Sequence, residues 1–330
     1  MVNKTSNCEY ISNKFKKPTV SIIIPTYNRL ESLNRTLKSI ISSTFKDFEI
    51  IIIDMGNSSE CLQSLIQSQI GNEISIRVIK GDETMYVSGS INEALHYVNG
   101  DYILICADDV VVERNTIENL VKTLSGHKDL GIICPLCYYL KRPDRIWWAG
   151  SKIDILTSRT YKYGIDLPLP DSNIFETDSF TTIALIRKEL FYDNGKLYFV
   201  DPKEFPIHNE EADFSFRARL KGWRVCVTKN AKAYHDISLP EEEHNLARLF
   251  HVHTQSRAYY VARNRIIFQK KYSKSWQFLI FILFFNWLFA IYYLRIILLK
   301  SDKPLFERLK IAFAYCRGIL SGIKWIITFR

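Results

Sequence analysis

The sequence predicts an α/β fold built on a doubly wound, mostly parallel sheet. Three apolar runs, VSIII from Val20, EIIII from Glu49 and YILIC from Tyr102, have the length of buried strands. Helical apolar spacing separates them, and this alternation is typical of right-handed βαβ units. Polar residues follow each run, at the strand ends where open α/β sheets bind ligands.

Short polar turns separate the predicted elements. Pro25 stops the first strand, and Asn28 is expected to cap the next helix, with Glu31 in the capping-box position. A second strand over residues 49–53 ends at Asp54. Apolar spacing then predicts helices near residues 62–66 and 91–98, and strands over residues 76–79 and 102–106.

The regular alternation loosens after Thr123. Residues 131–196 are rich in Trp, Tyr, Pro and Asp, and we expect shorter strands and loops there, of the kind that build a pocket over a ligand-binding half. A helix with an acidic start follows over residues 210–220. The composition changes near Tyr272, where we predict a domain boundary.

The segment after this boundary is apolar enough to enter a membrane. Between Trp276 and Leu299 only Gln277, Asn286 and Arg295 interrupt the apolar residues. Their spacing of nine places them alternately on opposite sides of a helix, so no polar face forms. The apolar stretch is close to the lower length limit of a bilayer span. A spanning helix and an immersed, non-spanning helix are both consistent with this pattern.

The last segment, residues 311–329, has a different pattern. Lys310, Arg317 and Lys324 recur every seven residues and therefore share one helical face. A basic amphipathic helix of this kind suits the surface of a membrane with anionic lipids. A GxxxG pair at residues 318–322 is a signal for close helix pairing and leaves a homodimer open.

Composition and missing motifs disfavour several classes of protein. The net charge is +9, but no Lys/Arg run is interleaved with aromatics, so no nucleic-acid partner is predicted. No GxGxxG follows the first strand and no GxxxxGK[ST] occurs, which disfavours a nicotinamide-dependent dehydrogenase and a phosphate-loop NTPase. Seven cysteines, an odd number, indicate reduced thiols in the cytosol, and the pair Cys134 and Cys137 is interpreted as core. The polar N-terminus predicts no signal peptide.

Two acidic clusters could carry chemistry. Asp108 and Asp109 follow the third strand, where carboxylates can hold a divalent ion against a phosphorylated ligand, although Asp is also common in turns. Residues 210–213 open a helix with three carboxylates, one of which could act as a general base, although acidic residues also favour a first turn. His235 is either a metal ligand or a structural histidine.

Ten motifs follow one another between about residues 18 and 270: VSIIIPTYNR, EIIIID, SGSINEAL, DYILICADDVVV, GIICP, IWWAGSKID, ALIRKELF, EEADFSFRARLKGW, KAYH and YYVARN. In this order they resemble family 2 glycosyltransferases with the GT-A fold, and in particular the bacterial and archaeal rhamnosyltransferase-like branch. The resemblance implies a sheet of GT-A type followed by a membrane-associated helical segment at the C-terminus.

The same resemblance implies roles for individual residues. Asp109 would hold Mg²⁺ or Mn²⁺ against a diphosphate, and His235 would be a second metal or phosphate contact. Glu211 would occupy the place of the family's catalytic aspartate, with Glu210 and Asp213 beside it. The nucleotide-sugar pocket would be lined by Pro25, Tyr27, Asn28, Arg29, Asp54, Asn92 and Asp108.

The implied activity is transfer of a sugar, with inversion, from a nucleoside-diphosphate sugar to a glycan or lipid-linked acceptor. The implied role is synthesis of a cell-surface polysaccharide or glycoconjugate on the cytosolic face of the cell membrane. The sequence departs from the family pattern at two positions: Ala107 replaces an acid of the DxD pattern, and Glu211 replaces an aspartate. These two differences leave a second function open. The alternative is a catalytically weakened homologue that binds a nucleotide sugar or a glycan within an assembly.

The resemblance also predicts a domain organisation. A polar lead over residues 1–17 precedes a GT-A domain over residues 18–272, and membrane-associated helices occupy residues 273–330. Within the GT-A domain, residues 18–125 are expected to bind the nucleotide sugar, and residues 126–272 to form the acceptor and catalytic half.

Overall fold

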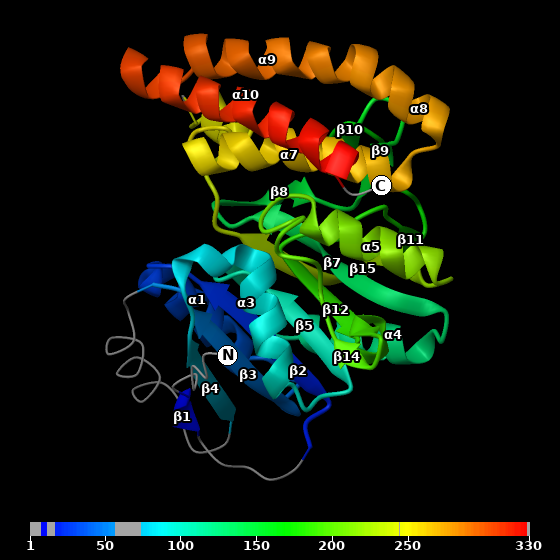
Figure 1. Ribbon diagram of the computed structural model, residues 1–330. Helices are drawn as coiled ribbons and strands as arrows, with labels where there is room; N and C mark the ends of the chain where they lie inside the picture. Colours follow the sequence, from blue (N-terminus) through cyan, green and yellow to red (C-terminus); the bar gives the residue numbers. More distant parts are fainter. Residues whose placement is uncertain (1–7, 12–16, 57–73, 244, 329–330) are drawn as a thin grey trace, which may run out of the picture.

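The computed structural model describes residues 8–11, 17–56, 74–243 and 245–328, and a mixed sheet forms its centre (Figure 1). The strands of this sheet are β1 (Cys8–Ile11), β2 (Val20–Thr26), β3 (Phe48–Asp54), β4 (Ser75–Lys80), β5 (Tyr102–Cys106), β6 (Val110–Val112), β7 (Leu130–Tyr139), β8 (Arg142–Trp148), β11 (Ile174–Glu176), β12 (Ile183–Arg187) and β15 (Arg224–His235). Two separate hairpins are β9 (Ser151–Asp154) with β10 (Arg159–Lys162), and β13 (Tyr192–Asp193) with β14 (Lys196–Leu197).

The order of the strands confirms the predicted doubly wound, mostly parallel sheet. The path is β1-β4-β3-β2-β5-β12-β7-β15-β11, with β6 paired to β15 and β8 paired to β7. Strands β4, β3, β2 and β5 are parallel neighbours, as are β7 and β15, whereas β12 runs antiparallel between the two groups. The isoleucines of β2 and β3 are fully buried, because strands covered on both faces need continuous apolar runs.

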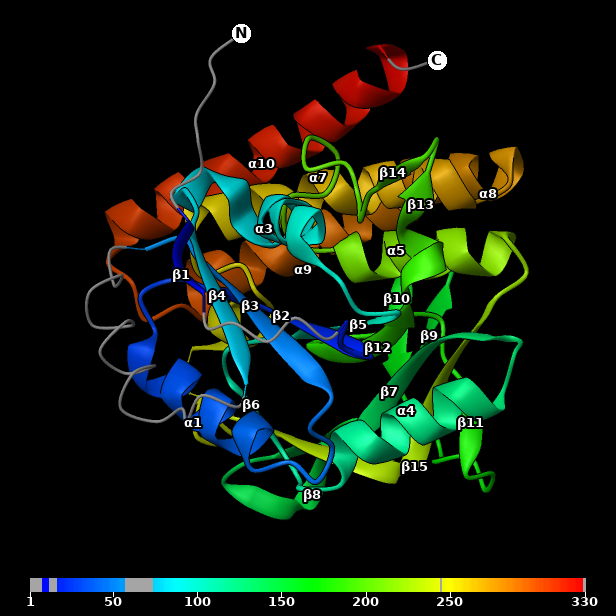
Figure 2. The same ribbon diagram turned by 90° about the horizontal axis from the view of Figure 1, so that it is seen from below.

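Helices cover both faces of the sheet. They are α1 (Leu30–Ile41), α3 (Tyr86–Ala94), α4 (Thr116–Gly126) and α5 (Glu210–Leu220). Figure 2 shows α1 and α4 on one face and α3 and α5 on the other. Helix α1 buries its predicted stripe of Leu33, Leu37 and Ile40 against the core. The helix predicted near residues 62–66 lies outside the described residues.

The start of α1 differs from the predicted capping box. The N-cap is Arg29, and no side chain accepts a cap hydrogen bond there. Asn28 precedes it in the left-handed region, at φ 53°, and its amide lies against the backbone position of Gly56. The capping prediction was wrong because Arg29 occupies the N-cap position, while Asn28 packs against the loop that follows β3.

The C-terminal helices form a layer on the side of the molecule away from β1 and β4 (Figure 1). Its elements are α6 (Leu246–Leu249), α7 (Gln255–Tyr272), α8 (Ser275–Ile280), the π-helical turn η4 (Phe281–Phe285), α9 (Asn286–Leu299) and α10 (Leu305–Thr328). We call α7 to α10 the helical layer. One buried apolar cluster includes Val261 and Ile266 of α7, Ile297 of α9 and Ile319 of α10. Helix α7 also contributes Ile267 and Phe268 to the core of the sheet, and the boundary near Tyr272 stays a prediction.

The predicted GxxxG pair joins two helices of the same chain. A side chain on Gly318 would collide with the carbonyl oxygen of Tyr259 on α7. A Cβ on Gly322 would lie 3.1 Å from the carbonyl oxygen of Arg263, one turn further along α7. The absence of side chains at both glycines thus lets α10 approach α7 closely. Figures 1 and 2 both show α10 running alongside α7.

Candidate active site

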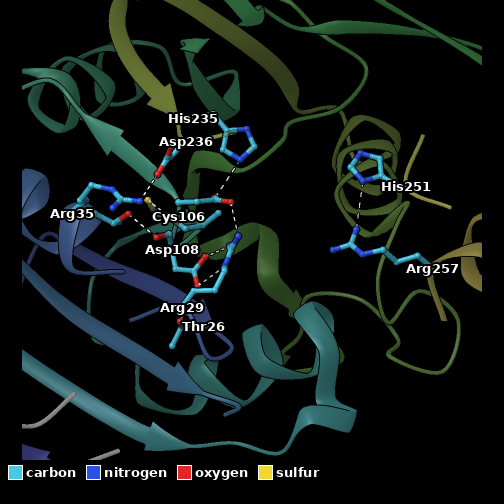
Figure 3. A network of polar contacts seen from close by, with 12 residues as sticks. Thr26, Arg29, Arg35, Cys106, Asp108, His235, Asp236, His251 and Arg257 are labelled. Carbon is cyan, nitrogen blue, oxygen red and sulfur yellow. Dashed lines mark hydrogen bonds and ion pairs between the residues drawn. The ribbon is translucent and has the colours of Figure 1, made fainter. Parts of the chain in front are cut away.

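The acidic pair predicted after the third strand belongs to the polar network drawn in Figure 3. Asp108 is buried and accepts a 2.7 Å hydrogen bond from the hydroxyl of Thr26, at the end of β2. Arg29 forms ion pairs with both carboxylates, with Nη2 at Asp108 and Nη1 2.9 Å from Asp109. Asp109 also lies 3.2 Å from Nε2 of His235, the last residue of β15. The ends of β2, β5 and β15 thus bring these side chains together.

The two carboxylates differ in their affinity for a proton. Burial acts to raise the pKa of Asp109, but the hydrogen bond and charge of His235, together with Arg29, outweigh it and lower this pKa to about 2. For Asp108 burial prevails and raises the pKa, against the opposing effects of Arg29 and Thr26. Asp109 is therefore the more firmly ionised of the two and the better candidate to face a cation.

Oδ1 of Asp109 has Nε2 of His235 as its one contact, at 3.2 Å, and the buried Nδ1 of His235 has no hydrogen-bond partner. A carboxylate oxygen and an imidazole nitrogen are both ligands of first-row divalent ions, so these two residues fit a metal such as Mn²⁺. Within the described ranges, no group of three or more His, Cys, Asp or Glu side chains is placed to hold an ion. A metal here would need further oxygen ligands from a bound anion.

Most of the other residues predicted to line the ligand pocket lie at or just after the carboxyl ends of β2 and β3. Asp54 is fully buried and accepts a 3.0 Å hydrogen bond from the backbone N–H of Gly56. Gly56 has no room for a side chain, because a Cβ there would collide with Asn28. Pro25 is half-buried, whereas Tyr27 is exposed. The two strand ends are therefore held against one another beside the acidic pair.

Asn92 has a place that the sequence did not indicate. Its amide nitrogen donates to the carbonyl oxygen of Val200 at 2.8 Å, and its oxygen accepts from the backbone N–H of Phe199 at 2.7 Å. Both polar groups of the side chain thus hold the backbone of residues 199–200, which leads toward α5. The geometry gives Asn92 a positioning role in this loop.

Among the acidic residues at the start of α5, Asp213 is engaged in structure. Its carboxylate is buried and receives the Tyr272 hydroxyl at 2.7 Å, the Lys271 ammonium at 2.8 Å and Nε of Arg217 at 3.0 Å. These contacts join α5 to the end of α7. Both oxygens of this carboxylate are thus occupied by donors of the protein itself, which fits a structural role.

Glu210 and Glu211 have the opposite environment. Burial raises the pKa of Glu210 to about 7, although Arg257 opposes this shift, and one of its oxygens has no hydrogen-bond partner. Burial and then the charge of Glu210 raise the pKa of Glu211 well above its ordinary value. A carboxylate with a raised pKa is a stronger base once it is ionised, as general-base catalysis requires.

One of these acidic residues lines a cavity. Glu211 opens onto a pocket of about 250 Å³ between the start of α5, the β9–β10 hairpin, α7 and α9. Neither Glu210 nor Asp213 lines it. Its lining residues are Ile153, Ser158, Thr160, His208, Asn209, Glu211, Phe250, His251, Val261, Arg265, Phe268 and Tyr293.

Sequence reasoning missed Arg257 and His251. His251 lines the pocket of Glu211, and its Nδ1 lies 3.4 Å from Nη1 of Arg257 on α7 (Figure 3). Burial lowers the pKa of Arg257, Arg29 lowers it further, and Glu210 opposes the shift. The charge of Arg257 is thus influenced both by the acidic network and by the start of α5. The sequence shows Arg257 as the first of two arginines in QSRAYYVARN, but nothing in the neighbouring residues indicates that it belongs to a site.

A family model described as "Glycosyl transferase family 2" matches residues 21–195, more than half of the chain. The chain belongs to this family. It is 31% identical over 130 residues to a cholesterol galactosyltransferase of Borreliella burgdorferi, covering 39% of this chain and 35% of the relative. It is 32% identical over 106 residues to the GalNAc(5)-diNAcBac-PP-undecaprenol beta-1,3-glucosyltransferase of Campylobacter jejuni, covering 32% and 34%. The chain thus spans about a third of the length of these curated relatives.

The solved structure of a mannosyltransferase from Pyrobaculum calidifontis, in complex with GDP-Man and Mn²⁺, has the same fold. The TM-score is 0.56 at 13% identity, over 99% of this chain and 92% of that one. This family 2 glycosyltransferase therefore has the GT-A fold, as the motifs predicted. The rhamnosyltransferase-like branch stays a prediction.

Proposed function

We propose that this glycosyltransferase moves a sugar, with inversion, from a nucleoside-diphosphate sugar to a lipid-linked or glycan acceptor in cell-surface glycan synthesis. The observation that carries the proposal is the place of Glu211, a carboxylate with a raised pKa that lines a pocket. His251 lines the same pocket and contacts Arg257, whose charge is coupled to Arg29 of the acidic network. Arg257 thus links the base proposed for the acceptor with the charged site proposed for the donor.

The residues divide the reaction between them. Glu211 takes the proton of the acceptor hydroxyl while that oxygen forms a bond to the anomeric carbon of the donor sugar. The bond from that carbon to the diphosphate oxygen breaks on the opposite side, which inverts the configuration. Arg29 and Arg257 stabilise the negative charge on the departing diphosphate. Asp109 and His235 would hold Mg²⁺ or Mn²⁺, which when bound neutralises charge on that leaving group.

A second candidate rests on the ion pairs of Arg29. Because Arg29 already neutralises both carboxylates of the acidic pair, the site is compatible with a homologue that binds a nucleotide sugar without turnover. Screening nucleoside diphosphates and their sugars for thermal stabilisation, with and without Mn²⁺, identifies the donor class. Release of nucleoside diphosphate with an added acceptor then supports the enzyme, whereas stabilisation without any product supports the binding homologue.

We also propose that the helical layer attaches the enzyme to the cytosolic face of the membrane. Two helices, Ser275–Leu299 and Leu305–Thr328, are long and apolar enough to cross a bilayer. Only 28% and 33% of their most apolar stretches are buried inside the protein. Large apolar side chains are exposed along both, with Trp287 of α9 51% and Phe313 of α10 66% exposed. Exposed large apolar side chains along two neighbouring helices mark an interaction site, and lipid is the partner that suits their composition.

The packing favours helices that lie in the interface over helices that span. Helix α10 is held along α7 by Gly318 and Gly322, and α7 in turn is joined to α5 through Asp213. A spanning α10 would have to leave these contacts. Its basic residues Lys310, Arg317 and Lys324 are all exposed, and each is followed three residues later by an exposed apolar one: Phe313, Leu320 and Ile327. Adjacent basic and apolar stripes are typical of interfacial helices.

Membrane attachment is tested by fractionation of the full chain in salt and carbonate washes. Charge reversal at Lys310, Arg317 and Lys324 should weaken binding to anionic vesicles, since each basic residue near such a surface contributes about 1 kcal/mol. The apolar surface should still retain the protein on the membrane. A wild-type protein that stays in the supernatant without detergent would contradict the assignment.

A further inference from the structure

Arg265 of α7 is a half-buried cation that forms no ion pair with a carboxylate of the described residues. Its Nη2 donates to the hydroxyl of Tyr293 at 2.9 Å, and its guanidinium carbon lies 4.1 Å from the ring centre of Phe289 and 4.8 Å from that of Tyr293. Nη1 is buried and has no hydrogen-bond partner. Across residues 17–56, 74–243 and 245–328, no Asp or Glu forms an ion pair with it, although seventeen other ion pairs are present.

Such a guanidinium is costly to the free protein. Taking a charge out of water carries a penalty of several kcal/mol unless an opposite charge or hydrogen bonds offset it. Stacking on Phe289 and Tyr293 and the hydroxyls of Tyr293 and Tyr315 offset this penalty in part, but no carboxylate of the described residues supplies an opposite charge. An anionic ligand would complete the site, and arginine matches the oxygens of phosphate particularly well.

The cavity beside Arg265 is the pocket of Glu211. At about 250 Å³ it is smaller than the roughly 300–1,000 Å³ of sites for drug-sized ligands, so it fits a headgroup and not a long glycan. Its wall toward the helical layer is apolar, from Phe250, Val261 and Phe268. One cavity therefore offers a base, an unpaired cation and an apolar wall.

An apolar path leads from this cavity to the outer surface of the helical layer. Phe250 lines the pocket and is 36% exposed, and its ring lies 5.5 Å from that of Tyr292. Tyr292 is 46% exposed on α9, next to Ile291 at 61%. A chain of hydrocarbon that left the pocket past Phe250 would thus reach the surface proposed to face lipid.

We propose that this pocket is an acceptor subsite that receives the phosphate-bearing headgroup of a lipid, with Arg265 as the ligand of the phosphate. The lipid tail leaves past Phe250 and Tyr292, and Glu211 faces the hydroxyl to be glycosylated. The inference rests on the proposed function, and it adds the chemical class of the acceptor and the residue that selects it. Free phosphate has the same anionic chemistry, but it lacks the hydrocarbon that the apolar path would hold.

Binding to the full-length protein in detergent tests the proposal without requiring turnover. The probes are farnesyl phosphate, farnesol and inorganic phosphate. The variants are Arg265→Gln, Arg265→Lys and the control Lys122→Gln, an exposed cation on α4 outside the pocket. Thermal unfolding and nucleotide affinity, measured on each variant, show that it is folded and that its donor site is intact.

Wild type and Lys122→Gln should bind farnesyl phosphate equally. Arg265→Gln should bind it about 10- to 100-fold more weakly, the range expected for a lost charge-assisted hydrogen bond, and Arg265→Lys should recover part of the affinity. Equal affinity of wild type and Arg265→Gln for farnesyl phosphate would overturn the proposal. Farnesol that binds wild type as tightly as farnesyl phosphate would overturn the phosphate role, and inorganic phosphate that binds as tightly would overturn the lipid role.

The result separates this inference from the proposed function. Arg265-dependent binding of farnesyl phosphate in a protein that shows no sugar transfer would support the subsite and contradict the enzyme. The opposite result is sugar transfer to a lipid phosphate with the same KM and kcat in wild type and Arg265→Gln. That result would support the enzyme and contradict the subsite.

Discussion

Replacing Glu211 with glutamine keeps the size of the side chain in the pocket and removes its basicity. General-base catalysis contributes roughly 10²- to 10⁴-fold in rate, so kcat should fall by at least about 10²-fold. That loss corresponds to about 3 kcal/mol of transition-state stabilisation. Donor binding should stay near the wild-type value, because Asp109, Arg29 and His235 lie in the separate acidic network.

The pH dependence follows from the same two carboxyls. Burial and the charge of Glu210 raise the pKa of Glu211 well above 4.5, so wild-type activity should increase with pH as Glu211 loses its proton. Folding stability should change in the opposite direction. Burial raises the pKa of Glu210 from 4.5 to about 7, so its contribution to stability is complete below pH 4.5 and is lost as pH rises through 7. The shift corresponds to roughly 3 kcal/mol.

The assay measures kcat and KM from nucleoside-diphosphate release between pH 5 and 9, together with urea unfolding over the same range. Glu210→Gln serves as the comparison, since it removes the neighbouring charge and leaves the base in place. In Glu210→Gln the rise of kcat with pH should occur at lower pH than in the wild type. The free energy of unfolding of this variant should also decrease less at high pH. Wild-type kcat in Glu211→Gln would refute the reasoning and pass the role to Glu210 or Asp213.

Three further outcomes are expected. Asp109→Ala should abolish sugar transfer, and it should also abolish the metal-dependent part of nucleotide binding, which a chelator removes from the wild type. A nucleotide affinity that changes neither with the mutation nor with the chelator would contradict the metal-binding role of Asp109. Asp213→Asn should destabilise the fold by about 2 kcal/mol in urea, a value discounted because its cationic partners are partly exposed. Gly318→Leu should lower the melting temperature by separating α10 from α7, whereas Gly126→Leu, with open space around it, should not.

Much of the donor half of the molecule could be predicted from local patterns. The strand from Val20, the strand that ends at Asp54 and the strand before Asp108 are all present and parallel. They could be predicted because burial on both faces requires an unbroken apolar run, which is visible in one stretch of sequence. Cys134 and Cys137 are buried in β7, as their apolar context indicated.

The acceptor side could be predicted only in part. The acidic start of α5 was evident, but the sequence could not show that Asp213 is held by Lys271 and Tyr272 while Glu211 opens onto a cavity. These residues differ by one helical turn or less, so no periodic pattern distinguishes them. Their roles depend on which of them faces α7, an element some fifty residues further along the chain.

Most of the elements, the family and the apolar character of the C-terminal helices could be predicted from local patterns, because periodicity and composition are properties of neighbouring residues. The tertiary structure decided that Gly318 and Gly322 pair α10 with α7 and not with another molecule's helix. It also decided that Arg265 has no carboxylate partner in the described chain, while Arg29 has two. Charge compensation is set by groups distant in sequence that meet only on folding, so only the folded structure reveals where a charge is left for a ligand.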